Sequence, residues 1–185
     1  MAIPGVILVR PMRFTDRRGY FCETYNWRDF AEIGIGVEFV QDNCSYSAQP
    51  LTFRGFHFQS PPHAQSKLIR VVTGRVLDIV VDLRVGSPDF CKHLATELSA
   101  ESGEQLFVPE GFAHGILTLE PETVVSYKVS NYYEPRAERG IIWSDPELGI
   151  SWAARPTDVS EKDSQLPMMR DLVSPFVFSE RHSAR

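Results

Sequence analysis

Short apolar runs alternate with turn-forming residues along most of this chain. The runs are rich in Val, Ile and Phe and are bounded by Gly, Pro and Asp, which is typical of β-strands rather than helices. A Thr73-Gly74 pair between two such runs predicts a tight hairpin. We expect strands at residues 6–10, 20–25, 37–41, 52–59, 67–72, 75–84, 93–99, 105–109, 114–120 and 124–130. This spacing favours an all-β antiparallel sandwich or barrel.

Helical periodicity is confined to residues 27–34 and to a short turn that begins at Ser160. No internal repeat or linker interrupts the pattern, and 185 residues suit one domain with a sizeable core. We therefore predict a single domain over residues 1–185, in which residues 171–185 form a loosely ordered tail.

Composition and charge narrow the classes of partner. The chain is 43% hydrophobic and 23% charged, as globular proteins are, and its net charge of −5 argues against binding to nucleic acid or an anionic membrane. Its three cysteines are odd in number and far apart, which predicts neither a disulfide framework nor a zinc site. No apolar stretch approaches the ~20 residues of a membrane-spanning helix, and the N-terminus lacks the features of a signal peptide. We expect a soluble cytoplasmic protein.

Strand alternation places polar side chains on otherwise apolar faces. Lys67 shares a face with Ile69 and Val71, and Tyr127 lies within the apolar run 124–130. A buried ammonium group needs an anion, a ligand or a route to water. Both side chains therefore predict an interior that holds something polar.

His57 and Arg54 have opposite parity in the run 52–59, so a regular strand would separate them. A β-bulge at Gly55, which lies between them, would direct both side chains into one cavity. We adopt this bulge as a hypothesis.

His57, Lys67 and Tyr127 together suggest proton exchange next to a carbonyl group. Histidine accepts a proton near neutral pH, a lysine ammonium stabilises an enolate, and a tyrosine hydroxyl returns a proton. Each residue also has an ordinary structural interpretation, since a histidine between two phenylalanines and a tyrosine in an apolar strand are common in cores. Asp163 could orient His57, but the spacing Ser160-x-x-Asp163 is more often a helix cap.

A metal site is the main chemical alternative. Small β-barrels of the cupin kind often bind a metal through an HxH pair, but here the corresponding residues are His57 and Gln59. His57 and His114 alone supply too few ligands for zinc or another transition metal. The sequence therefore predicts no metal.

Seven blocks of sequence closely resemble the nucleotide-sugar 3,5-epimerase family, in the family's order, within a match from about Pro4 to about Asp171. They are RGFHFQ (54–59), PPHAQSKLIRVVTGRVLDIVVDLR (61–84), GSPDF (86–90), LSAESGEQLFVPEGFAHG (98–115), YKVSNYYEP (127–135), ERGIIWSDPELGISW (138–152) and SEKD (160–163). The resemblance implies a cupin-type jelly roll without metal or cofactor. It implies a homodimer that inverts C3 and C5 of a dTDP-4-keto-6-deoxyhexose.

The same resemblance implies a role for individual residues. His57 matches the family's base, Asp163 its dyad partner, Lys67 the group near the C4 carbonyl and Tyr127 the proton donor. The segment from Arg18 to Glu23 is expected to reach the neighbouring subunit's pocket. Residues that match substrate contacts or border them are Arg18, Phe21, Glu23, Gln41, Asp42, Asn43, Arg54, His114, Tyr133, Glu138 and Lys162.

Two departures from the family pattern border the sugar pocket. The loop SAQPLTF (47–53) is longer and lacks a glycine, and Phe56 replaces a common leucine. Either could alter which carbon is exchanged, so a single-carbon epimerase on a related nucleotide sugar stays open. A non-catalytic sugar-nucleotide-binding cupin is the other alternative, although simple binding would not require an acid–base pair.

Overall fold

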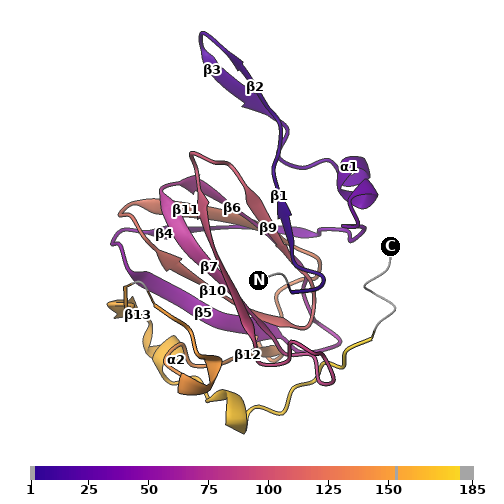
Figure 1. Cartoon of the computed structure of the whole chain (residues 1–185), viewed down its shortest axis with the longest axis vertical. Helices are drawn as coiled ribbons and strands as arrows, with labels where there is room; N and C mark the ends of the chain where they lie inside the picture. The colour runs from indigo at the N-terminus through magenta and orange to yellow at the C-terminus, as the bar shows by residue number, and fades with distance from the viewer. Residues whose placement is uncertain (1–2, 153, 180–185) are drawn as a thin grey trace.

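The computed structural model describes residues 3–152 and 154–179, and its two antiparallel sheets face each other as a jelly roll (Figure 1). The first sheet has the order β1 (Ile7–Val9), β9 (Gln105–Val108), β6 (Lys67–Thr73), β11 (Thr123–Val129) and β4 (Gln41–Ser47). The second has the order β12 (Glu138–Gly140), β5 (Thr52–Gln59), β10 (Phe112–Thr118), β7 (Arg75–Asp82) and β8 (His93–Ser99). The short strand β13 (Asp158–Val159) runs parallel to β5. The predicted all-β cupin-type fold is confirmed.

Helices are few and short in the described part of the chain. They are α1 (Trp27–Glu32), α2 (Glu161–Ser164) and the 3₁₀ turns η1 (Pro146–Leu148) and η2 (Met169–Asp171). Within the residues described, none is long and apolar enough to cross a membrane. A two-stranded hairpin, β2 (Arg13–Asp16) with β3 (Gly19–Cys22), stands away from the two main sheets (Figure 1).

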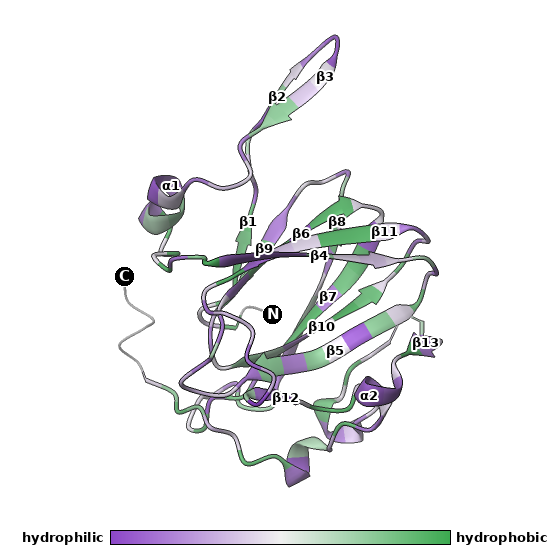
Figure 2. Ribbon diagram, turned by 180° about the vertical axis from the view of Figure 1, so that it is seen from behind, coloured by the Kyte–Doolittle hydropathy of each residue, from purple (hydrophilic) through white to green (hydrophobic). Residues whose placement is uncertain are grey.

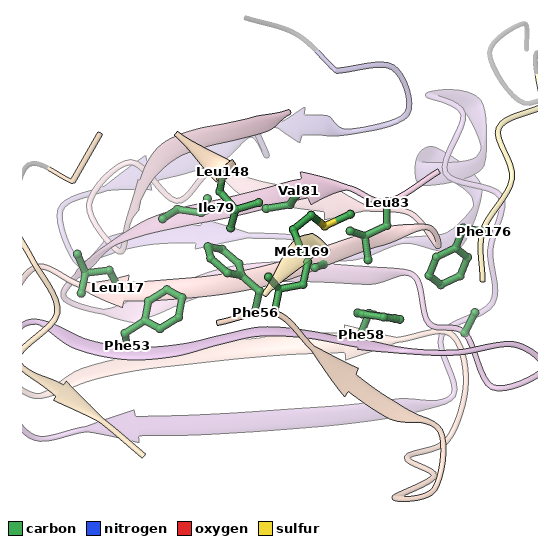
Figure 3. Close-up of a cluster of buried hydrophobic side chains, with 13 residues drawn as sticks. Phe53, Phe56, Phe58, Ile79, Val81, Leu83, Leu117, Leu148, Met169 and Phe176 are labelled. Atoms are coloured by element: carbon green, nitrogen blue, oxygen red, sulfur yellow. The ribbon is translucent and has the colours of Figure 1, made fainter. Parts of the chain in front are cut away.

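Two hydrophobic layers lie on the two faces of the second sheet. Between the sheets, Ile69 and Val71 of β6 pack with Val80 of β7. On the opposite face, Phe53 and Phe56 join a cluster that the C-terminal segments cover (Figure 3). Because both faces are covered, β7 and β10 are buried almost throughout. Hydrophilic bands interrupt β5 (Figure 2).

The predicted hairpin at Thr73-Gly74 is wrong, because β6 and β7 belong to different sheets. Gly74 instead turns the chain from one sheet to the other, with φ +81° and no room for a Cβ atom against Thr123. A glycine between two apolar runs suits either turn, so local sequence could not separate them.

Two of the predicted strands differ most from the observed ones. The strand expected at residues 37–41 begins only at Gln41 and continues through the polar stretch to Ser47. The strand expected at residues 20–25 is β3, which ends at Cys22 and pairs with β2, a strand that the apolar pattern did not indicate. The side chains of β4 face a cavity and solvent in turn, so the strand contains few apolar residues. A search for apolar runs therefore misses most of it.

The predicted tail is packed as far as the structure describes it. Phe176 is buried in the outer cluster, and Val177 forms a parallel bridge with Val85. Residues 180–185 of the predicted tail lie outside the described residues.

Candidate functional site

A cleft of about 470 Å³ opens between the two sheets, and a second pocket of about 260 Å³ adjoins it. His57, Lys67 and Tyr127 line both pockets. His57 comes from β5 of one sheet, whereas Lys67 and Tyr127 come from β6 and β11 of the other. The fold therefore brings the three residues with the predicted proton-transfer chemistry together, from two facing walls.

A bulge in β5 turns Arg54 and His57 into the same cleft. Arg54 opposes Ile116 of β10 and His57 opposes His114, so three residue steps on β5 face two on β10. Gly55 has φ +142°, and a Cβ atom there would lie 2.5 Å from the Cα atom of the facing β10 glycine. The predicted bulge at Gly55 is confirmed, and only glycine fits it.

Asp163 at the end of the cleft orients His57. The carboxylate Oδ1 lies 2.7 Å from Nε2 of His57, and Oδ2 accepts a hydrogen bond from the Gly55 N–H at 3.1 Å. Burial alone would raise the pKa of Asp163, but hydrogen bonds from His57, Gly55 and Ser160 outweigh it and lower the pKa. Ser160 also caps α2, so both interpretations of the Ser160-x-x-Asp163 spacing hold. The pairing leaves Nδ1 of His57 free to accept a proton from a ligand.

Lys67 lies on the opposite wall, partly buried, and its Nζ donates to the His57 carbonyl oxygen at 3.4 Å. Burial lowers the pKa of Lys67 to about 8, although the negative charges of Asp78 and Glu138 act against this shift. Burial also raises the pKa of Tyr127, so its phenol keeps its proton at neutral pH. The cleft thus combines an oriented imidazole, an ammonium group and a neutral phenol.

His114 forms a second histidine–aspartate pair beside the first. Its Nε2 lies 2.9 Å from Oδ1 of Asp78, whose side chain is fully buried on the inner face of β7. Sequence reasoning missed Asp78. Its signal was a carboxylate between the apolar residues of a buried strand, where burial requires a partner.

A polar network borders the second pocket. The hydroxyl of Tyr133 donates to Glu138 Oε2 at 2.7 Å, and Lys162 Nζ lies 2.6 Å from the same oxygen. Gln41 donates to Asn43 Oδ1 at 2.8 Å and accepts from the Tyr133 N–H at 3.2 Å. Burial would raise the pKa of Glu138, but its hydrogen bonds from Lys162 and Tyr133 outweigh this effect and lower it.

Four of the predicted site residues lie elsewhere. Asp42 points to the outer face of β4 and pairs there with Lys128 at 2.8 Å, because alternation separates it from Gln41. Arg18, Phe21 and Glu23 belong to the projecting hairpin or follow it, away from both pockets (Figure 1). Their side chains could border a cleft only on another molecule.

The cleft also has walls that sequence reasoning did not identify. Alternation could have indicated Ser45, which shares the inner face of β4 with Gln41 and Asn43. The parallel pairing of β13 with β5 has no comparable sequence signal. Lining residues outside the prediction are Ser45, Thr52, Phe53, Phe58, Gln59, Gln65, Ile116, Asp158 and Ser160. Across residues 3–152 and 154–179, no three His, Cys, Asp or Glu side chains cluster in a way that could hold a metal ion.

Proteins of a known family are similar to this chain in both sequence and fold. The sequence model described as dTDP-4-dehydrorhamnose 3,5-epimerase matches residues 1–171. A dTDP-4-dehydrorhamnose 3,5-epimerase of Sinorhizobium fredii is 48% identical over 179 residues, which cover 96% of this chain and 92% of the relative.

Two solved structures agree with this result. The dTDP-4-dehydrorhamnose 3,5-epimerase of Bacillus anthracis, with TDP and PPi bound, has a TM-score of 0.88 and 46% identity, and the match covers 89% of this chain and 94% of the other. The dTDP-6-deoxy-D-glucose-3,5-epimerase of Legionella pneumophila, in complex with dTDP-4-keto-L-rhamnose, has a TM-score of 0.89 and 35% identity, with 94% of each chain covered. The chain therefore belongs to the dTDP-4-dehydrorhamnose 3,5-epimerase family.

Proposed function

We propose that this protein is an isomerase that inverts C3 and C5 of dTDP-4-dehydro-6-deoxy-D-glucose and so forms dTDP-4-dehydro-L-rhamnose. One observation carries the proposal above all: His57 and Tyr127 come from facing sheets and line one cleft, with Lys67 beside them. Inversion of a carbon centre needs a base on one side of the ring and an acid on the other. The family membership of the chain supports the same reaction.

The reaction begins with proton removal next to the C4 ketone. Nδ1 of His57 takes the proton from C3 or C5, and the electron pair of that C–H bond moves to the C4 oxygen as an enolate. Asp163 stabilises the imidazolium ion that forms, through the 2.7 Å contact at Nε2. The ammonium of Lys67 stabilises the negative oxygen.

Tyr127 completes the inversion. Its phenol donates a proton to the same carbon from the opposite face, and the enolate returns to the ketone as the new C–H bond forms. His57 then releases its proton, and Tyr127 regains one from solvent. Because C3 and C5 both adjoin C4, one set of groups serves both centres.

The remaining polar residues of the cleft bind the substrate. Arg54 and Lys162 are suited to the diphosphate, because both are cations at the cleft wall. Gln41 and Asn43 are suited to nucleotide hydrogen bonds, and Tyr133 offers an exposed aromatic face for thymine. Glu138 and His114 lie within reach of the same ligand.

We assign the projecting hairpin to a homodimer. It carries aromatic side chains with large exposed fractions, 68% for Phe21 and 58% for Phe14, on a two-stranded element that cannot bury them itself. A neighbouring subunit would cover them. In such a dimer Arg18 and Glu23 would complete the partner's nucleotide pocket.

Product analysis tests the proposed reaction. The purified protein is incubated with dTDP-4-dehydro-6-deoxy-D-glucose, a 4-keto reductase traps the product, and NMR assigns its ring stereochemistry. We expect inversion at both C3 and C5. Inversion at one carbon alone would restrict the activity to a single-carbon epimerase, and recovery of unchanged sugar would refute catalysis.

A further inference from the structure

The second histidine–aspartate pair has no part in the proton transfers described above. Asp78 lies in the middle of β7, where its neighbours on the same face, Val76 and Val80, belong to the core between the sheets. Its side chain has no measurable exposure. Burial of a carboxylate in such a position costs free energy unless the group is paired. The presence of Asp78 there therefore needs an explanation.

Among the described residues, hydrogen bonds reach one of the two carboxylate oxygens of Asp78. Oδ1 accepts from Nε2 of His114, whereas Oδ2 is buried and forms no hydrogen bond with any residue in ranges 3–152 and 154–179. A neutral His114 would therefore leave the negative charge uncompensated on the Oδ2 side.

Lys67 lies across the core from this part of β7, on the same face of β6 as Ile69 and Val71. Those two side chains pack in one cluster with Val76 and Val80, the neighbours of Asp78. Lys67 projects from β6 on the facing sheet, and Asp78 is the strongest of the charges that favour its ammonium form. The ionisable groups that border the cleft around Lys67 come from five further strands, from the loop before β12 and from α2. They are Arg54 and His57 of β5, His114 of β10, Tyr127 of β11, Tyr133 of the loop, Glu138 of β12, Asp158 of β13, and Lys162 and Asp163 of α2.

We propose that Asp78 is a positioning residue of the active site, which fixes the ring of His114 and keeps Lys67 positively charged. The inference rests on the proposed epimerase function for its consequence in catalysis. It extends that function with a residue that touches no substrate. Because a carboxylate only accepts hydrogen bonds, it also fixes the tautomer of His114, with hydrogen on Nε2 and with Nδ1 directed at the cleft.

Asp78→Asn separates the two roles. The asparagine oxygen can still accept from His114, so the ring keeps its place, but the charge is lost. We expect NMR of ¹³Cε-labelled lysine to show that Lys67 titrates at a pH lower by roughly one unit than in the wild type. The descending high-pH limb of kcat should move by a similar amount, while KM changes less.

Asp82→Asn is the matched control. Asp82 is equally buried on the same face of β7, but Arg84 already neutralises it through contacts at 2.6 and 2.9 Å. Its substitution should lower stability and leave the Lys67 titration unchanged. A Lys67 titration that is the same in Asp78→Asn and wild type would overturn the proposal.

A measurement on the wild type keeps the proposal testable if Asp78→Asn does not fold. Long-range ¹⁵N NMR of labelled histidine should assign the hydrogen of His114 to Nε2. A hydrogen on Nδ1 alone would contradict the orienting role. Neither NMR experiment requires turnover, so a failure of the Asp78 proposal is distinguishable from a failure of the proposed epimerase activity.

Discussion

At the scale of single residues, the chemistry of the cleft depends on protonation states that burial and pairing set. Asp163 stays ionised because three hydrogen bonds outweigh its burial, and His57 is thereby held as a base with one tautomer. Tyr127 stays neutral because burial disfavours the phenolate. Each group is in the form that proton removal and return require.

The ammonium of Lys67 gives the reaction its high-pH limit. Its pKa is about 8, so the charged fraction falls as the pH rises through that value. We predict that kcat of the wild type falls between about pH 7.5 and about pH 9.5, measured as initial rates at saturating substrate. Lys67→Arg should have a lower kcat that does not change with pH over this range, because arginine stays charged. A wild-type kcat that is constant to pH 9.5 would contradict the role of Lys67.

Removal of the charge tests the same residue at fixed pH. Lys67→Met keeps an apolar chain of similar length and should lower kcat by about 100-fold to 1,000-fold at neutral pH, the usual loss for one electrostatic group. Circular dichroism should report an intact fold, because an apolar Met suits the partly buried position of Lys67 beside Ile69 on the same face of β6. A loss below about tenfold would show that O4 is stabilised by another group.

At the scale of elements, the bulge in β5 decides whether Arg54 and His57 share the cleft. Gly55→Ala places a methyl group within 2.5 Å of the facing backbone and forces a residue with a side chain into φ +142°. We predict a loss of at least about 2 kcal/mol in the free energy of unfolding, measured by urea denaturation, together with reduced activity.

Gly36→Ala is the control for this substitution. A Cβ atom at Gly36 meets nothing within 4 Å, and its φ lies outside the left-handed range. The free energy of unfolding should change by less than about 0.5 kcal/mol. Equal effects of the two substitutions would show that the bulge has no special requirement for glycine.

Elements differ in how much of them the sequence predicts. Strands such as β7 and β10 are buried on both faces and rich in apolar residues, so the sequence predicts them readily. Strand geometry also predicts that Lys67 shares the inner face of β6 with Ile69 and Val71. The polar strand β4 and the route of the chain at Gly74 were not recognised. Both depend on pairing between distant segments, which no local pattern contains.

The candidate site could be predicted in the same uneven way. His57, Lys67 and Tyr127 stand out because ionisable groups in apolar strands require an explanation. The role of Asp163 could not follow from residue types, because the same spacing also caps a helix, as Ser160 does here. The side chain of Asp42 lies on the outer face of β4 with Lys128, and a match to a family motif does not report which face a side chain takes.

At the scale of the whole molecule, the hairpin extends from the jelly roll and predicts a shared active site. In the proposed dimer each pocket combines His57 of one subunit with Arg18 of the other. His57→Asn and Arg18→Ala variants should each be weakly active at low substrate concentration. After mixing and subunit exchange, about one quarter of wild-type activity should return, because half of the dimers then hold one intact site.

Mixing also has a clear negative outcome. No recovery after verified subunit exchange would mean that Arg18 and His57 act in the same pocket or that Arg18 has no part in binding. Analytical ultracentrifugation supplies the check on the assembly itself, with a dimer expected for the wild type.

The central claim is that His57 and Tyr127 act on opposite faces of one ring, and exchange of sugar hydrogens with heavy water tests it most directly. We predict that NMR detects deuterium at C3 and C5 with the wild type, exchange with little inversion for Tyr127→Phe, and neither for His57→Asn. His63→Asn and Tyr46→Phe, both outside the cleft, should behave as the wild type. Deuterium exchange by His57→Asn at the wild-type rate would contradict the account.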